Sequence, residues 1–142
     1  MILVHIPVIK GDSKIKGHTD WISVEDFSFG VEREFTESGK AGSADINLGI
    51  GEMRECSMSK AFDRSSADLM QHAVAGNSVG TVEIHFVETE GVEGQGHVYL
   101  AYKLDSTFIK SWEQSGSADD RPTDTFTLWY YKLSLTYWST PD

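Results

Sequence analysis

Apolar and polar residues alternate with a period of two along much of the chain. In the segment 82–88, VEIHFVE, the first, third and fifth residues are apolar and a polar residue follows the first and the third. The same alternation recurs over 44–50 and over 97–104. This period is typical of strands that bury one face and expose the other. The pattern therefore predicts a mainly β protein.

The alternation changes phase in two places. Five apolar residues near the N-terminus fall on two parities: Ile22 and Val24 on one, and Phe27, Phe29 and Val31 on the other. A β-bulge at Glu25 and Asp26 would bring all five to one face. A similar slip follows Tyr130, where burial on both sides around Trp129 would explain the pattern equally well. Bends of this kind predict a small antiparallel β-barrel or curved sandwich.

One segment, about 66–75, has the pattern of a helix. Ser65 is the expected N-cap, Asp68 completes a pair resembling a capping box, and Gly76 provides a left-handed stop. Four apolar residues form the expected buried stripe: Leu69, Met70, Ala73 and Val74. The sequence therefore predicts a single short α-helix beside the β core.

The chain of 142 residues has the length and composition of one domain, with 39% hydrophobic and 24% charged residues. Segments rich in Gly, Ser and charge predict loops at 36–43, 90–96 and 114–122. No repeat, linker or low-complexity tract divides the sequence. We therefore expect a single domain spanning residues 1–142.

Charge excludes one class of function. Twelve basic and 22 acidic side chains give a net charge of -10, and the segment 65–102 contains no Lys or Arg. Phosphate backbones are bound by clustered cations, which this chain lacks. Nucleic acid is therefore not an expected partner.

The cysteine count and the N-terminal sequence bear on location. A single cysteine, Cys56, cannot form an internal disulfide, and the apolar run at 1–9 is interrupted by His5 and Pro7. The run lacks the basic start and small-residue cleavage site of a signal peptide and is too short to span a membrane. We expect a protein that folds in a reducing cytosol, without membrane insertion, and whose export, if any, uses no signal peptide.

The five histidines raise the question of a metal site. None occurs in an H-E-x-x-H motif, and one cysteine excludes the thiolate zinc patterns. If 82–88 and 97–104 form a hairpin that turns near Gly91, His85 and His97 lie nearly opposite each other with Glu83 nearby. No third ligand is evident, so the interpretation favoured is exposed histidines on a strand face, with no metal and no cofactor.

Catalytic arrangements are also weak. His18 lies close in sequence to Asp12, Ser13 and Asp20, but neighbours on one loop point apart, whereas triad members converge from a rigid framework. The S-x-x-K matches at 13–16 and 57–60 require a helix to bring Ser and Lys together. We therefore predict no catalytic residues.

Several motifs in order resemble one family. A Gly-acid-Ser turn is followed by a nearby His, an aromatic-Ser-aromatic-Gly strand end, a K-x-x-D-x-x-S entry to the helix and a Pro-Thr-acid step before the last strand. They fall on Gly11, Asp12, Ser13 and His18; on Phe27, Ser28, Phe29 and Gly30; on Lys60, Asp63 and Ser66; and on Pro122, Thr123 and Asp124. Over nearly its whole length the chain resembles the haemolysin-coregulated protein (Hcp) family, the tube protein of bacterial type VI secretion.

The resemblance implies a structural rather than an enzymatic role. Members of that family form a β-barrel-like subunit that closes into a homo-hexameric ring. Rings stack into a hollow tube, which a contractile sheath propels with its spike proteins and which carries effector proteins in its lumen. By this resemblance the protein assembles in the bacterial cytoplasm and is exported to the medium or a target cell.

The segment 36–43 has a specific role by the same resemblance. It lacks a large apolar residue and contains two glycines, so it is expected to protrude as a mobile loop. The corresponding loop of the family contacts the next ring. The predicted ring-stacking residues are Glu37, Ser38, Gly39, Lys40, Ala41 and Gly42.

Two alternatives remain at the level of the sequence. A phage-type tail-tube protein shares the fold and the assembly and would differ in gene neighbourhood. A secreted carbohydrate-binding or enzymatic β-module would use exposed aromatics, for which Trp21, Trp112, Trp129 and Trp138 are candidates. Aromatics on alternating strands are more often part of a core or an interface.

Overall fold

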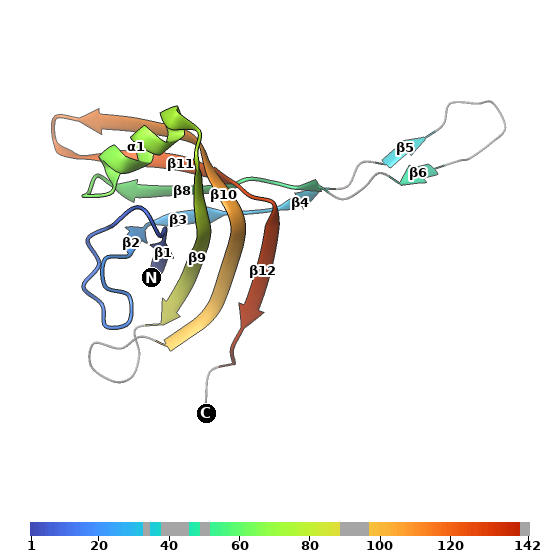
Figure 1. Ribbon diagram of the computed structural model, residues 1–142, viewed down its shortest axis with the longest axis horizontal. Helices are drawn as coiled ribbons and strands as arrows, with labels where there is room; N and C mark the ends of the chain where they lie inside the picture. The colour runs from blue at the N-terminus through green and yellow to red at the C-terminus, as the bar shows by residue number, and fades with distance from the viewer. Residues whose placement is uncertain (33–34, 38–45, 49–51, 89–96, 140–142) are drawn as a thin grey trace.

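An eight-stranded antiparallel sheet and one helix make up most of the computed structural model (Figure 1). The structure describes residues 1–32, 35–37, 46–48, 52–88 and 97–139. The single helix of this part is α1, Ser66–Ala75. The strands are β1 Ile2–His5, β2 Ile22–Val24, β3 Asp26–Ser28, β4 Val31–Glu32, β5 Phe35–Glu37, β6 Ile46–Leu48, β7 Glu52–Met53, β8 Cys56–Ala61, β9 Ser78–Glu88, β10 His97–Ser117, β11 Asp120–Trp129 and β12 Lys132–Tyr137. The mainly β fold with one short helix is confirmed.

The sheet bends back toward its own beginning without closing. Its strands follow the order β2-β1-β9-β10-β11-β8-β3, and β12 pairs with β10 beside this path. The two ends of the path, β2 and β3, are halves of one segment that are separated only by Glu25. The Glu25 amide donates to the Ser59 carbonyl of β8 at 2.8 Å. The segment 22–28 therefore changes its pairing partner from β1 to β8 across a single residue, Glu25. This change gives the sheet its barrel-like curvature.

The expected phase change at Glu25 and Asp26 is present. Ile22 and Val24 are buried, and Phe27 and Phe29 pack against the same core after the break. Val31 is 64% exposed, so the prediction that all five apolar residues share the buried face is wrong for this last one. The cause is that Val31 already belongs to β4, which pairs with β7 outside the main sheet.

The core lies inside the bend of the sheet. The alternation in 82–88 buries Val82 and Ile84, and Leu104 of β10 joins them from the neighbouring strand. At the far end, Phe126, Leu128 and Tyr130 are buried, and Leu133 packs against the same core on the opposite parity. The predicted change of parity is present between β11 and β12 for Leu133, but the prediction is wrong for Tyr131, Leu135 and Tyr137, which are exposed.

Helix α1 differs in detail from its predicted pattern. Gly76 has φ 73° and its amide donates to the His72 carbonyl at 3.0 Å, so the left-handed stop is confirmed. Ser65 makes no side-chain capping bond, because its hydroxyl donates to the Asp63 carboxylate instead. The buried stripe is narrower than expected. Leu69 is buried and Ala73 packs against the core, whereas Met70 and Val74 are exposed.

The loop predictions are partly wrong. Strand β10 runs to Ser117 and β11 begins at Asp120, so the expected loop 114–122 is a hairpin with a two-residue turn. Cross-strand pairing of the polar residues stabilises strands where composition alone suggests a loop. The loop expected at 36–43 begins later, because β5 continues to Glu37. The segment 90–96 lies outside the described residues.

Figure 1 also shows an arm that leaves the main sheet through β4 and ends in β5 and β6. Strands β4 and β7 form one two-stranded ribbon, and β5 and β6 form a second. Strand β6 lies within the alternating segment 44–50, so the strand predicted there is present over Ile46–Leu48. The arm therefore projects a two-stranded ribbon away from the core.

Candidate functional site

A buried charged cluster joins four elements: β8, α1, β10 and β11. Lys60 of β8 is fully buried, and its ammonium group donates to Asp63 at 2.8 Å, to the Ser66 hydroxyl at 2.9 Å and to Asp124 at 2.9 Å. Ser66 also donates to Asp124, and the Asp63 amide donates to Ser66 at 3.0 Å. Gln114 of β10 donates to the second oxygen of Asp124 at 3.2 Å. The cluster satisfies a lysine that burial would otherwise make very unfavourable.

The electrostatics of this cluster favour a charged carboxylate. Burial by itself raises the pKa of Asp124. Hydrogen bonds from Ser66 and Lys60, together with the charge of Lys60, lower the pKa by more than burial raises it, so the net pKa lies below the ordinary value. Lys60 and Asp124 have no exposed side-chain surface. A substrate has no access to these groups, so we assign the cluster a structural role.

The sequence motifs pointed to this cluster only in part. K-x-x-D-x-x-S and Pro-Thr-Asp are two motifs far apart in the sequence. The structure brings them together through the pairing of β8 with β11. Lys60 and Asp124 face each other in the register of these strands. The S-x-x-K interpretation of Ser57 and Lys60 fails because an odd spacing along a strand places the two side chains on opposite faces.

The candidate residues around His18 do not converge. The Ser13 hydroxyl accepts from the Ile15 amide at 3.3 Å, and Asp12 accepts from the Arg64 amide at 3.3 Å. Asp20 pairs with the Arg64 guanidinium at 3.7 Å. His18 is turned toward another histidine, His85, on β9. These contacts hold the side chains of Ser13, Asp12, Asp20 and His18 on different partners.

The histidine pair expected to share a strand face is separated by the register. The hairpin of β9 and β10 is confirmed, but His97 lies opposite Glu88 and His85 lies opposite Ala101. The partner of His85 is His18, with 2.9 Å between His18 Nε2 and His85 Nδ1. Local sequence carries no signal for this contact, since the two residues are 67 positions apart.

Other groups able to hold a metal or attack a substrate are poorly placed. Within the described ranges, no three His, Cys, Asp or Glu side chains are grouped as metal ligands. Cys56 is fully buried, and burial raises the pKa of its thiol to about 12. Such a thiol stays protonated and unreactive near neutral pH.

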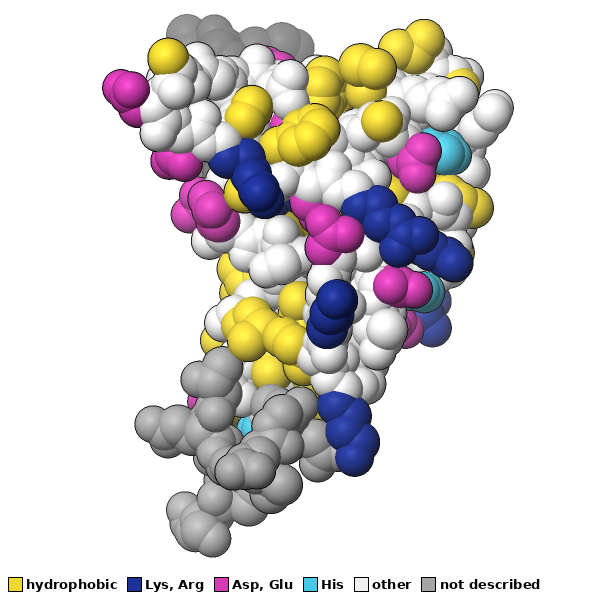
Figure 2. Space-filling model, turned by 90° about the vertical axis from the view of Figure 1, so that its left-hand side faces the viewer, with side chains coloured by type: hydrophobic (Ala, Val, Ile, Leu, Met, Phe, Trp, Pro, Cys, Tyr) yellow, Lys and Arg dark blue, Asp and Glu magenta, His cyan; other side chains and the backbone are white. Residues whose placement is uncertain are grey.

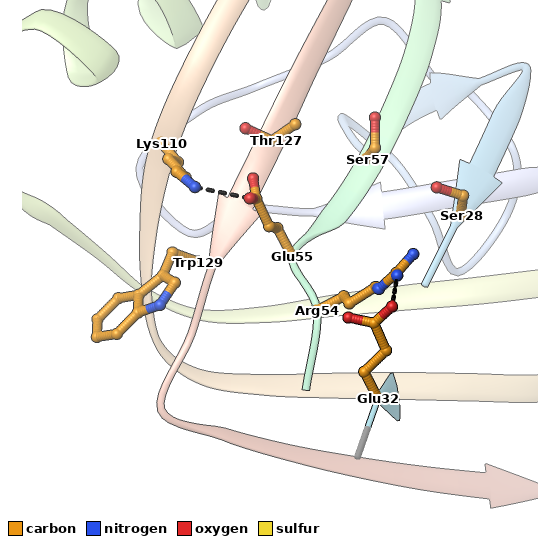
Figure 3. A pocket seen from close by; sticks show the side chains of 8 residues that line it. All are labelled: Ser28, Glu32, Arg54, Glu55, Ser57, Lys110, Thr127 and Trp129. Atoms are coloured by element: carbon orange, nitrogen blue, oxygen red, sulfur yellow. Dashed lines mark hydrogen bonds and ion pairs between the residues drawn. The ribbon is translucent and has the colours of Figure 1, made fainter. Parts of the chain in front are cut away.

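A polar groove lies between β3, β8, β10 and β11 and is shown in Figure 3. It has a volume of about 550 Å³. Arg54 pairs with Glu32, Lys110 pairs with Glu55 at 2.6 Å, and Trp129 borders the groove. Because these charges neutralise one another, the groove has no strong preference for an ionic ligand.

The surface has no single dominant charge on the face shown in Figure 2, where basic and acidic side chains are interspersed with apolar ones. The described helix is too short and too polar to cross a membrane. Several of the exposed large apolar side chains lie on and around β12. The exposed members are Tyr131 (66% exposed), Leu135 (54%), Tyr137 (67%) and Trp138 (44%).

Strand β12 also has an unpaired edge. Among the described strands it pairs only with β10, through a ladder from Asp105–Lys132 to Leu100–Tyr137. Figure 1 shows β12 at the outer side of the layer that also contains β9 and β10. An exposed edge with large apolar side chains is a template for pairing with another chain. The four exposed apolar residues and this edge are called the β12 surface below.

The fold defines a class: a mainly antiparallel β protein with an open, barrel-like sheet, one short helix and a projecting two-stranded arm. The sequence places it more closely. The family model described as "Type VI secretion system effector, Hcp" matches residues 3–137, and the chain therefore belongs to the Hcp family of type VI secretion. The resemblance seen in the sequence motifs is confirmed.

Solved structures agree with this assignment. A "type six secretion system protein" is 25% identical, with a TM-score of 0.82 over 96% of this chain and 82% of that one. Hcp1 from Salmonella typhimurium is 20% identical, with a TM-score of 0.75 over 96% and 85% of the two chains. A type VI secretion system effector from Yersinia pestis is 18% identical, with a TM-score of 0.76 over 96% and 89%. Comparison with curated protein sequences gives no match.

Proposed function

We propose that this chain is the tube subunit of a type VI secretion system. In this role it forms homo-hexameric rings that stack into a hollow tube. A contractile sheath propels the tube together with its spike proteins, and effector proteins travel in the lumen. Membership of the Hcp family over residues 3–137 and the fold shared with solved type VI secretion proteins support this proposal.

The observation that carries the proposal is the β12 surface. The free edge presents backbone donors and acceptors, and the exposed fractions of Leu135 and Tyr137 exceed one half. Isolated exposed apolar residues are common, but several of them along a strand with one unpaired edge mark an interaction surface. A contact between this surface and a different surface of the next copy is heterologous, and heterologous contacts close into rings when the rotation permits.

This role requires no chemistry from the subunit. The buried Lys60 cluster is inaccessible, and the side chains of Asp12, Asp20 and His18 contact Arg64 and His85, not one another. We therefore infer a non-enzymatic protein without a cofactor. Its assembly takes place in the bacterial cytoplasm, and its export with the tube needs no signal peptide.

A phage-type setting is the second candidate. The cap that terminates the tube of an anti-feeding prophage has a TM-score of 0.60 to this chain at 12% identity, over 96% of this chain and 87% of that one. This likeness concerns the fold alone. The carbohydrate-binding alternative has less support, because Trp112 packs against the core and Trp21 packs against histidines.

The ring proposal is tested by the mass of the protein in solution and by one substitution on the β12 surface. The unmodified protein in reducing buffer should scatter light as a hexamer of the 15.8 kDa chain. Tyr137→Lys places a charge on the edge strand and should shift the mass toward the monomer. Its folding should be unaffected, because Tyr137 is 67% exposed. Charged residues on an edge are a known way to prevent strand association.

Val74→Lys is the matched control, since Val74 is 84% exposed but lies on α1. This variant should remain hexameric, because the substitution adds the same charge at a different surface. A monomeric unmodified protein at micromolar concentration would contradict the ring. A fully hexameric Tyr137→Lys protein would contradict the assignment of the β12 surface to the ring contact.

A further inference from the structure

The segment 11–21 covers the outer face of the sheet over β1 and β9. Leu3 of β1 is fully buried but is not part of the main core. In the register of the sheet it lies beside His85 of β9, so the two side chains share this outer face. Trp21 packs on His85 with 4.6 Å between ring centroids, and on His18 with 4.5 Å. The segment therefore forms a second, smaller layer outside the sheet.

Two histidines join this layer to the sheet. His18 of the segment is 7% exposed, and its Nε2 lies 2.9 Å from His85 Nδ1. The rings are perpendicular, with an interplanar angle of 80° and centroids 5.1 Å apart. In a hydrogen bond of this kind one nitrogen carries the hydrogen and the other accepts it.

The hydrogen bond determines where an additional proton can go. If His18 is protonated, it carries hydrogens on both Nε2 and Nδ1. If His85 is protonated, its Nδ1 donates, so neutral His18 must accept at Nε2 and carry its own hydrogen on Nδ1. In both cases a hydrogen lies on His18 Nδ1. This atom is buried and has no hydrogen-bond partner in the part of the chain that the structure describes.

A buried N–H without an acceptor is unfavourable. The neutral pair avoids it through the tautomer in which His18 donates from Nε2 and leaves Nδ1 without a hydrogen. A second proton would in addition place hydrogens on both facing nitrogens and break the bond between the rings. The arrangement in which the segment 11–21 packs on β1 and β9 is therefore more stable with a neutral histidine pair than with a protonated one.

From this geometry we propose that His18 and His85 form a pH-sensitive latch, which holds the segment 11–21 on β1 and β9 at neutral pH and releases it under mildly acidic conditions. Release exposes both rings to water and separates them. The inference concerns this segment within one subunit and does not rest on the proposed role in a tube.

The surrounding charges leave this preference in place. Burial lowers the pKa of His18, and this effect outweighs the opposing effect of the Lys16 backbone, whose contact with the ring does not reach hydrogen-bond geometry in the structure. Burial also lowers the pKa of His85, and the neighbouring His18 and His5 lower it further, against the opposing charge of Glu83. Lys103 of β10 lies opposite Glu83 in the sheet, and the segment itself carries four charged residues: Asp12, Lys14, Lys16 and Asp20.

The direction of the pH effect follows from these lowered pKa values. In the released segment both histidines have their ordinary pKa of about 6.5, so the released state binds protons more readily than the closed state. The closed state is fully favoured above about pH 6.5. It loses stability as the pH falls through that value toward the lower pKa values of the closed pair.

Hydrogen exchange of the intact protein tests the latch. The segment contains backbone hydrogen bonds that report its integrity, including Gly11 N to Asp20 O at 2.8 Å and Asp20 N to Ser13 O at 2.8 Å. After correction for intrinsic exchange rates, opening of 11–21 should increase at least about threefold between pH 7.5 and 5.5. The segment 108–117, which contains no histidine, is the internal reference. The ratio of its opening at pH 5.5 to its opening at pH 7.5 should be near one. An unchanged ratio for 11–21 would overturn the proposal.

Two variants separate the latch from general acid sensitivity. His18→Gln removes the buried ring nitrogen that has no acceptor for a hydrogen, so the ratio for 11–21 should fall well below that of the unmodified protein. Burial of His85 leaves a smaller pH dependence in this variant. His72→Gln on α1 should keep the ratio of the unmodified protein, since His72 bonds the Asp68 carbonyl within its own helix. Full pH dependence in His18→Gln would contradict the latch.

Titration of the unmodified protein by NMR gives an answer even if His18→Gln does not fold. The imidazole signals of His18 and His85 should titrate below pH 6.5 and should shift together, because they share one hydrogen bond. Independent titration of both rings at the ordinary value would overturn the proposal.

Discussion

At the scale of single residues, the clearest steric requirement is at Gly11. A Cβ atom there would lie 2.4 Å from the Trp21 carbonyl oxygen and 2.6 Å from the Ile22 α-carbon. Both are backbone atoms, so no side chain can move to make room. The Gly11 amide donates to the Asp20 carbonyl at 2.8 Å, which holds the two ends of the segment 11–21 together. The glycine of the Gly-acid-Ser turn is therefore fixed by close backbone packing.

Gly11→Ala should destabilise the protein by about 1–3 kcal/mol, because the added methyl group must displace backbone that is hydrogen-bonded in β2 or the segment before it. Urea unfolding measures the difference. Gly30→Ala is the matched control. Its Cβ would have its nearest neighbour, Arg54 Cδ, at an ordinary 3.5 Å, so its effect should stay within about 0.5 kcal/mol. Equal free energies of unfolding for the two variants would show that the backbone near Trp21 can shift at little cost.

At the scale of secondary-structure elements, the Lys60 cluster explains how α1 is attached. The helix begins at Ser66, whose hydroxyl contacts both Lys60 of β8 and Asp124 of β11. Asp63 Oδ1 accepts from the Ser65 amide at 2.8 Å, which satisfies a backbone donor just before the helix. Because the ionic groups also bond the helix start, the direction in which α1 leaves the sheet is fixed by the cluster.

Asp124→Asn should destabilise the protein by about 3 kcal/mol at pH 7, because it leaves the buried ammonium group of Lys60 with less compensating charge. The pKa of Asp124 is lower in the folded protein than in the unfolded chain. The stabilisation is therefore complete above about pH 4 and is lost as the pH falls through the folded-state pKa. Urea unfolding at several pH values should show the two proteins converging in acid.

Asp120→Asn is the control for that experiment. Asp120 lies at the exposed start of the same strand, β11, and its carboxylate accepts only from the Arg121 amide among the described contacts. The substitution should change stability by less than about 0.5 kcal/mol at every pH. A similar loss in both variants would mean that the effect of Asp124→Asn does not come from Lys60.

At the scale of the whole molecule, the arm is the feature that stands apart from the main sheet. Of the predicted ring-stacking residues, Glu37 ends strand β5, and Ser38, Gly39, Lys40, Ala41 and Gly42 lie outside the described residues. Strands β5 and β6 lead away from the main sheet in Figure 1. An element that projects in this way is suited to contact another molecule, which is compatible with the proposed ring-stacking role.

Shortening Ser38 to Gly42 should leave the hexamer and its thermal unfolding temperature nearly unchanged while suppressing tube formation and export. The reason is that the change falls beyond β5, which pairs with β6 in a ribbon separate from the main sheet. Electron microscopy counts tubes, and light scattering checks the ring. Export at the unmodified level from the shortened protein would show that these residues do not stack rings.

The sequence by itself determined the local features of this protein. The period of two identified the strands β9 and β10, the change of parity located the break at Glu25, and Gly76 marked the end of α1. These features depend on residues a few positions apart, where side-chain direction follows directly from backbone geometry. The same local pattern failed for Val31 and Val74, because exposure also depends on what packs against each element.

Only the tertiary structure decided which distant residues meet. The hairpin of β9 and β10 was predictable, but its register with β1 placed His85 beside the segment 11–21 and not beside His97. The pairing of β8 with β11 likewise brought Lys60 to Asp124. A shift of one residue in either ladder would turn these side chains to the opposite face. Register is set by the packing of the whole sheet, and for that reason neither contact could be derived from local sequence.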